Sequence, residues 1–136
     1  IVPTDHILAS RNEISLGECS EFDLVIPSET LSLRRVLDNA WSKNAGGPIH
    51  PALEVNSIGL IKSLVIHGAG VGFTTAFDAL SEIAKGQLVF IPVTGGKIDL
   101  STLSIVSASG RNLSVPASLL IQHLAQTMEL EGVPTI

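Results

Sequence analysis

Charged residues are scarce in this sequence. Its 136 residues include 8 lysines and arginines and 13 aspartates and glutamates, so 15% of the chain is charged. An average soluble domain has about 25%. The formal net charge is -5, and the few basic residues are not gathered into a run. Because affinity for nucleic acid comes largely from neutralised phosphates, the composition argues against direct nucleic-acid binding by this stretch.

Cysteine is almost absent. Cys19 stands alone, which excludes an intrachain disulfide, and the four histidines lack the spacing of metal ligands. We therefore expect no metal, no cofactor and a reducing compartment, the cytoplasm. The neighbouring Glu18 and Glu21 should raise the pKa of the thiol, so Cys19 is predicted to be a small, half-buried loop residue rather than a nucleophile.

A long uninterrupted apolar run is also missing. The most apolar window, residues 52–77, is interrupted by Asn56, Lys62, His67 and four glycines. It therefore falls short of the roughly 20 apolar residues that a membrane-spanning helix needs. Residues 1–10 are not expected to be a signal peptide, because polar side chains break any apolar run and no basic region precedes it.

What the chain does have is an alternation of apolar patterns. Hydrophobic residues make up 45% of it and its mean hydropathy is +0.43, which excludes disorder. Short apolar runs predict strands, here Asp23–Pro27, Ala52–Val55, Val71–Thr74, Leu88–Pro92 and Leu103–Ala108. Helical spacing predicts four helices. The first has the buried face Leu33, Val36, Leu37, Ala40 and Trp41, and the next two cover Ser57–His67 and Ala76–Lys85. The last begins at Ser114, and its inward-facing residues are Leu120, Ile121, Leu124 and Met128. Strands separated by helices predict an α/β protein with a mostly parallel sheet, buried on both faces.

The glycine-rich segment Gly68–Gly72 invites comparison with a dinucleotide-binding loop. Such a loop must leave a strand and open a helix. Here the glycines close a helix and lead into a strand, so they predict a helix C-cap and a tight turn. No GxSxG motif is present, and no pair of nucleophile and base can be named. The chain is not expected to be an enzyme.

Two polar segments stand where an α/β sheet binds ligands, beyond the carboxyl ends of strands. Ser28, Glu29 and Thr30 follow the first predicted strand, and Asn56 and Ser57 follow the second. Hydroxyl or amide groups at a helix start form a good cradle for a carboxylate or another small anion. Plain N-capping is the alternative interpretation, and Glu29 counts against an anionic ligand unless its side chain points away.

Several segments also occur in a characteristic order. They are Val2–Ala9, Ile14–Glu18, Asp23–Pro27, Leu33–Asp38, Glu54–Ser57, Leu64–Val65, Gly68–Phe73, Gly86–Val89, Leu103–Ala108 and a serine-opened C-terminal helix. Their joint order, over nearly the whole chain, resembles the effector-binding domain of LysR-type transcriptional regulators, bacterial proteins that sense a small molecule. Ile7 and Phe77 depart from the family pattern, which usually has proline at both places, near the passages between the family's two subdomains.

The resemblance implies a periplasmic-binding-protein-like type II fold, with a mostly parallel sheet and flanking helices. One subdomain would be complete and a second present in part. Residues 1–75 would form the second effector subdomain, with its first strand partly missing, and residues 76–136 the C-terminal part of the first. The N-terminal winged helix-turn-helix would be absent from this chain. Relatives hold the effector between subdomains, so the implied effector-binding residues are Ser28, Glu29, Thr30, Asn56, Ser57, Gly72, Phe73 and Thr74.

The implied function is small-molecule sensing and oligomerisation, as a homodimer or homotetramer, with a carboxylate as the expected kind of effector. DNA would be contacted only through the absent domain, and no membrane or cofactor is expected. A solute-binding lobe of a transporter-type binding protein is the alternative, and a small α/β enzyme is the third hypothesis. Exposed apolar patches are expected where missing strands and partner subunits would pack.

Overall fold

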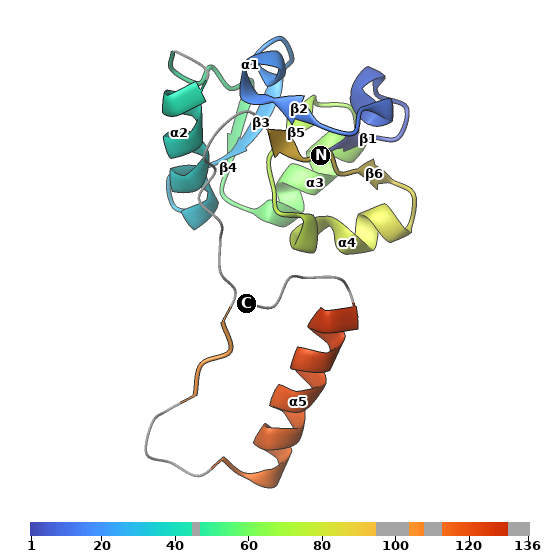
Figure 1. The fold of residues 1–136 in the computed structure, drawn as a ribbon. Coiled ribbons are helices and arrows are strands. Elements are labelled where there is room, and N and C mark those ends of the chain that lie inside the picture. The colour runs from blue at the N-terminus through green and yellow to red at the C-terminus, as the bar shows by residue number, and fades with distance from the viewer. Residues whose placement is uncertain (45–46, 95–103, 108–112, 131–136) are drawn as a thin grey trace. The chain divides into compact units, whose positions relative to one another are not determined.

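The computed structural model describes residues 1–44, 47–94, 104–107 and 113–130. The chain divides into two compact units, Ile1–Asp99 and Leu100–Ile136, which are described separately (Figure 1). The elements in chain order are β1 (Val2–Pro3), the 3-10 helix η1 (Ile7–Ser10), β2 (Ile14–Ser15), α1 (Leu16–Cys19), β3 (Leu24–Pro27), α2 (Ser32–Asn44), β4 (Leu53–Val55), α3 (Ile58–Ile66), β5 (Val71–Gly72), α4 (Ala76–Ala84), β6 (Leu88–Val89), β7 (Val93–Thr94) and α5 (Val115–Leu130). Among the residues described, no helix is both long and apolar enough to cross a membrane.

The first unit is built on a parallel three-stranded sheet with the order β4-β3-β5. In the middle strand, Pro27 pairs with Val55 of β4 and Val25 pairs with Gly72 of β5. β1 pairs antiparallel with β6, and β2 pairs parallel with β7. Gly72 also exchanges two backbone hydrogen bonds with Ile1, of 2.7 and 3.0 Å, so the chain entering β1 lies beside β5. The predicted α/β class with a mostly parallel sheet is confirmed.

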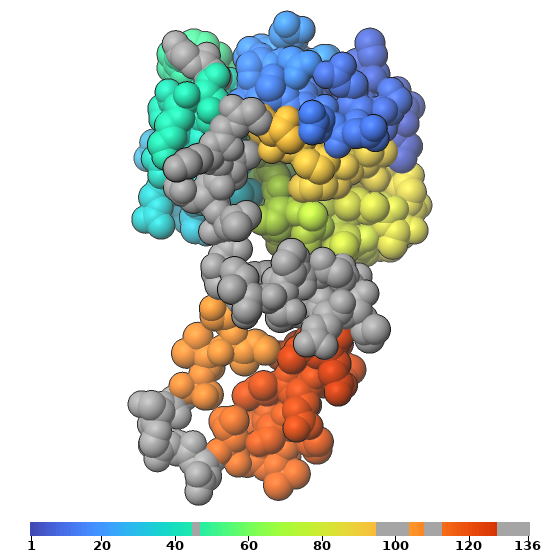
Figure 2. All heavy atoms as spheres, in the orientation of Figure 1, coloured from blue at the N-terminus to red at the C-terminus, as the bar shows by residue number. Residues whose placement is uncertain are grey.

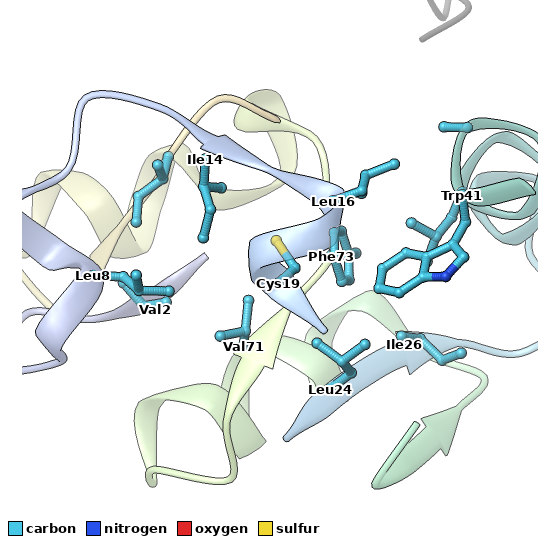
Figure 3. Close-up of a cluster of buried hydrophobic side chains, with 13 residues drawn as sticks. Val2, Leu8, Ile14, Leu16, Cys19, Leu24, Ile26, Trp41, Val71 and Phe73 are labelled. Atoms are coloured by element: carbon cyan, nitrogen blue, oxygen red, sulfur yellow. The ribbon is translucent and has the colours of Figure 1, made fainter. Parts of the chain in front are cut away.

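The side chains of β3 alternate between two hydrophobic clusters, because successive side chains of a strand point to opposite faces. Leu24 and Ile26 lie in one cluster with Trp41 of α2, as Figure 3 shows. Val25 lies in the other cluster with Ile61 of α3. All residues of β3 are buried. Helices α1 and α2 therefore cover one face of the sheet and α3 and α4 the other, and burial of both faces accounts for much of the apolar composition.

The glycine-rich turn after α3 has the predicted role. Gly68 and Gly70 have φ angles of 80° and 129°, in the region that favours glycine. A side chain on Gly70 would meet the backbone oxygen of Asp23. The two glycines therefore suit a turn that ends α3 and brings the chain back into β5, as predicted.

Three predictions about this unit need correction. The predicted strand Leu88–Pro92 is shorter, because β6 pairs with β1 only as far as Val89 and the chain then pairs with β2 through β7. The strand predicted over Val71–Thr74 ends at Gly72, where pairing with β3 ends. Cys19 is not a half-buried loop residue: it lies in α1 and is 1% exposed, within the first cluster.

The predicted subdomain division after residue 75 concerns the intact two-subdomain protein and stays a prediction. In this chain α4 and β6 belong to the same compact unit as the residues before them. Ala79 of α4 is fully buried in the second cluster. Lys62 of α3 donates hydrogen bonds to the Asp78 backbone oxygen at 2.7 Å and to the Glu82 carboxylate at 2.8 Å. These contacts attach α4 to α3.

In the second unit, whose described residues are orange and red in Figure 2, several large apolar side chains are exposed. Leu120 and Leu124 were predicted to face inward, and they are 57% and 42% exposed instead. Ile121 is half-buried, and the side chain of Met128 lies outside the description. Within the described part of this unit no second helix covers α5, so its helical pattern has no partner to bury it. The further exposed residues are Ile105, Val106, Leu113, Val115 and Leu119.

The strand predicted over Leu103–Ala108 is not found in its described part. Residues 104–107 are not in a strand, and Leu103 and Ala108 lie outside the described residues. A strand needs a neighbouring strand to pair with, and none pairs with residues 104–107 in the described part of the chain. The predicted opening of the last helix is confirmed, because the Ser114 hydroxyl accepts the Ala117 amide hydrogen at 3.4 Å.

Candidate functional site

Three polar segments leave the same edge of the parallel sheet. Ser28–Thr30 follows β3, Asn56–Ser57 follows β4, and Gly72–Thr74 begins with the last residue of β5. Because these strands are parallel and adjacent, their carboxyl ends meet at one edge, which we call the carboxyl edge. The structure thus brings all the predicted effector-binding residues to neighbouring segments.

The Ser28–Thr30 segment presents hydroxyl groups that do not cap a helix. The Ser28 and Thr30 hydroxyls hydrogen-bond to each other at 2.8 Å. The Ser28 amide donates to the Val55 carbonyl at 2.8 Å, and its carbonyl accepts from the Leu31 amide at 3.0 Å. In the described residues neither hydroxyl accepts from an amide of α2. Plain N-capping therefore does not account for this segment.

The Asn56–Ser57 segment behaves differently. Ser57 is the N-cap of α3, and its hydroxyl accepts the Leu60 amide hydrogen at 3.4 Å. Asn56 is exposed, and its side chain has no hydrogen-bond partner in the part of the chain that the structure describes. Here the N-capping alternative holds for Ser57, and Asn56 carries the groups open to a ligand.

The Gly72–Thr74 segment is largely engaged in the core. Both backbone groups of Gly72 bond to Ile1. The ring of Phe73 is 9% exposed and packs edge-on against Trp41, with 6.3 Å between ring centroids. Thr74 is half-buried, and its hydroxyl lies 3.5 Å from an Asp78 carboxylate oxygen. Within this segment, the hydroxyl of Thr74 is the side-chain group that a ligand could use.

Thr75 was missed by the sequence analysis. It is the N-cap of α4: its hydroxyl accepts the Asp78 amide hydrogen at 3.2 Å and donates to the Asp78 carboxylate at 2.7 Å. A threonine followed three residues later by an acidic residue is the sequence signal that would have identified it. The cap fixes where α4 begins relative to β5.

Three helices start at the carboxyl edge. α2, α3 and α4 begin at Ser32, Ile58 and Ala76, after β3, β4 and β5 respectively. The start of a helix has unpaired amide groups and the positive end of its dipole. Together the three starts favour negative charge or hydrogen-bond acceptors at this edge.

Arg34, in the first turn of α2, was also missed. Its Nε donates to Asp38 at 2.8 Å, and its Nη1 contacts Glu54 of β4 at 3.0 Å and the Pro27 carbonyl at 3.3 Å. The hydrogen bond with Asp38, and then that with Glu54, raise the pKa of Arg34, against the opposing effect of burial. The signal in the sequence is weak, because Glu54 is twenty positions away and only the Asp38 spacing suggests a pair.

Other chemistry finds no support in this unit. Burial first, and the charge of Glu18 in addition, raise the pKa of Cys19 to about 11, so the thiol is not a nucleophile at neutral pH. No group of three or more metal-binding side chains occurs among the described residues. Glu29 is exposed to solvent.

The sequence matches the family model described as LysR substrate binding domain over residues 1–129. It is 31% identical over 134 residues to the HTH-type transcriptional regulator CbbR of Xanthobacter flavus, which is 97% of this chain and 38% of that protein. The chain thus spans about two fifths of the length of this curated relative.

Two solved structures resemble the fold. One is the regulatory domain of CcmR from Synechocystis PCC6803 in complex with 2-PG, with a TM-score of 0.64 and 19% identity, over 93% of this chain and 60% of that one. The other is the effector binding domain of QuiR in complex with shikimate, with a TM-score of 0.60 and 18% identity, over 91% of this chain and 56% of that one.

These likenesses confirm the predicted periplasmic-binding-protein-like type II fold class. The three proteins described above are named as a transcriptional regulator, a regulatory domain and an effector-binding domain. The chain belongs to the LysR substrate binding domain family.

Proposed function

We propose that this chain is the effector-sensing part of a LysR-type transcriptional regulator and has no enzymatic activity of its own. The observation that carries the proposal is the carboxyl edge, where three helix starts and the polar segments after β3, β4 and β5 meet in a chain of this family. Unpaired amides and hydroxyls at such an edge recognise a small polar molecule.

A carboxylate is the effector class that best suits this edge. Carboxylate oxygens accept hydrogen bonds from the groups that gather there, namely helix-start amides and hydroxyls. The similar domains of CcmR and QuiR are in complex with 2-PG and with shikimate, and shikimate is a carboxylate. The proposed contacts come from Ser28, Thr30, Asn56, Ser57 and Thr74, with Glu29, Gly72 and Phe73 in the same segments.

The proposed mechanism follows from two subdomains in the intact protein. Residues 1–75 would supply the second subdomain and residues 76–136 part of the first, with the effector between them. A ligand that binds one arrangement better shifts the population toward it. The angle between subdomains would then set how a DNA-binding domain, present outside this chain, is held in a cytoplasmic homodimer or homotetramer.

The proposal is tested by thermal unfolding of the complete regulator with 2-PG, shikimate and other small carboxylates. A ligand at about 100 times its Kd stabilises the folded state by about 2.7 kcal/mol. We expect at least one carboxylate to raise the Tm, and the double substitution Ser28→Ala, Thr30→Val to abolish that rise.

Ser42→Ala is the matched control, because Ser42 on α2 is also exposed and its hydroxyl donates a hydrogen bond to the Asn39 carbonyl of the same helix at 3.1 Å. It should leave the ligand-dependent rise unchanged. If no carboxylate stabilises the regulator, the carboxylate part of the proposal is wrong. If no small molecule of any class does, the sensing function is wrong.

A further inference from the structure

The most connected charged group at the carboxyl edge is the guanidinium of Arg34. Its side chain is 16% exposed, whereas its carboxylate partners Asp38 and Glu54 are 47% and 42% exposed. It also donates to the carbonyl of Pro27, the last residue of β3. One side chain therefore joins the start of α2, the end of β3 and the strand β4.

The two ion pairs of Arg34 differ in what they connect. Asp38 lies one turn further along α2, so its pair stays within one helix. Glu54 lies in β4, two residues before Asn56, so its pair crosses to a different element. Of the two ion pairs, the one with Glu54 reaches β4, where it adds to the backbone hydrogen bond that the Ser28 amide donates to the Val55 carbonyl at 2.8 Å.

Geometry favours arginine for this task. Its planar fork can donate from Nε and Nη1 to three acceptors at once, which a lysine ammonium on a flexible stem does less well. A pair with one largely buried member is less screened by solvent than a pair on the open surface. The arginine therefore holds Glu54 more firmly than the exposure of that carboxylate alone would indicate.

We propose that Arg34, through Glu54, is a positioning residue that holds the Ser28–Thr30 and Asn56–Ser57 segments as one unit. This inference rests on the proposed function, because those segments are two of the three that form the proposed effector site. Arg34 acts through Glu54 and Pro27 and needs no contact with the effector. Loss of the pair leaves the backbone hydrogen bond from Ser28 to Val55 in place but removes the side-chain link. The two segments then move more freely relative to each other, so a ligand that contacts both must order them again when it binds.

The test compares Glu54→Gln with Asp38→Asn in the complete regulator. Both substitutions remove one carboxylate charge that pairs with Arg34, from side chains of similar exposure, and only the first breaks the ion pair between α2 and β4. Hydrogen exchange is measured on the amides of both segments. Binding of 2-PG and of shikimate is measured by calorimetry on the same samples.

We expect Glu54→Gln to speed exchange in both segments and to raise the Kd of any probe that binds by about fivefold, a typical coupling between contacting residues. Asp38→Asn should change neither quantity by more than about 1.5-fold, because Arg34 keeps its contacts with Glu54 and the Pro27 carbonyl when the Asp38 charge is removed. Arg34→Lys should reproduce the effect of Glu54→Gln. The Tm values of Glu54→Gln and Asp38→Asn should agree, because each loses one partly exposed ion pair.

Three outcomes overturn the inference. The first is an equal effect of Asp38→Asn and Glu54→Gln, which would make Arg34 a support of α2 only. The second is faster exchange in Asn56–Ser57 alone. The third is binding that Glu54→Gln leaves unchanged. If neither probe binds the unmodified regulator, that result counts against the proposed carboxylate site, while the exchange comparison still decides whether Arg34 links the segments.

Discussion

The two compact units of this chain differ in how their apolar side chains are buried. In the first unit, β3 is entirely buried between helices on both faces of the sheet. In the second, the described residues of α5 expose leucines over much of the helix. The helices of the first unit and α5 of the second all have apolar residues at helical spacing. The comparison therefore teaches that this spacing predicts a helix, whereas burial of its apolar side chains depends on a partner element.

The largest expected difference in stability is between truncation of a buried side chain in the first unit and of an exposed one in the second. Trp41 is 3% exposed and packs against Phe73, so Trp41→Ala should lower the free energy of unfolding by about 3–5 kcal/mol. Leu119 is 60% exposed, and Leu119→Ala should change it by less than about 0.5 kcal/mol. Urea unfolding followed by circular dichroism measures both. Similar values for the two variants would mean that Leu119 is buried in the protein studied, and the contrast would fail.

A smaller effect is expected from adding one methyl group to β5. A Cβ on Gly72 would lie 2.6 Å from Val65 Cγ2 and 3.0 Å from Ile61 Cγ2, so Gly72→Ala should destabilise the first unit by about 1–3 kcal/mol. Gly47→Ala is the control, because a Cβ there meets nothing within 4 Å. The midpoint of urea unfolding tests the pair. A Gly72→Ala variant as stable as the control would show that α3 moves away from β5 at little cost.

Helix caps offer the same comparison on a smaller scale. Thr75→Ala removes the N-cap of α4 and should destabilise the first unit by about 1 kcal/mol. Ser114→Ala removes the corresponding hydroxyl at the start of α5. Since little covers α5 in the described residues, loss of the Ser114 hydroxyl should speed amide exchange in that helix alone. Faster exchange in β3 or α3 on Ser114→Ala would contradict the division of the chain into two compact units.

The smallest effect should appear in the pH dependence of the first unit. Backbone and side-chain hydrogen bonds from Ser15 lower the pKa of Glu18 below its ordinary value of 4.5. The ionised carboxylate therefore stabilises the folded state above pH 4.5, and this contribution is lost as the pH falls through the lowered pKa of Glu18. Glu18→Gln should flatten the acid side of a plot of Tm against pH, and an unchanged slope would refute the assignment.

The strands and helices near the carboxyl edge were largely predictable, because their signals are local. The run Asp23–Pro27 and the cap residue Ser57 each lie within a few positions of the structure they form. The roles of Phe73 and Gly72 were not, since the same residues could line a site or pack in a core. Their burial follows from Trp41 and Ile1, which are more than thirty positions away along the chain.

Long-range ion pairs were equally hidden. Arg34 and Glu54 each belong to a predicted element, but the register of β3 and β4 brings them together. In α5, apolar spacing predicted a buried stripe at Leu120 and Leu124 that the described residues leave exposed. Sequence patterns therefore located the carboxyl edge, whereas tertiary contacts decided which of its side chains remain free to contact a ligand.

The hydrogen bond between the Ser28 and Thr30 hydroxyls limits how many hydroxyl donors are free for a ligand at the end of β3. Each hydroxyl has a single hydrogen, and one of the two is already used in the 2.8 Å bond between them. The pair therefore presents one free donor, and this donor is polarised by the bond behind it. From these two hydroxyls a ligand oxygen therefore receives a single directed hydrogen, so the pair can serve one acceptor atom at a time.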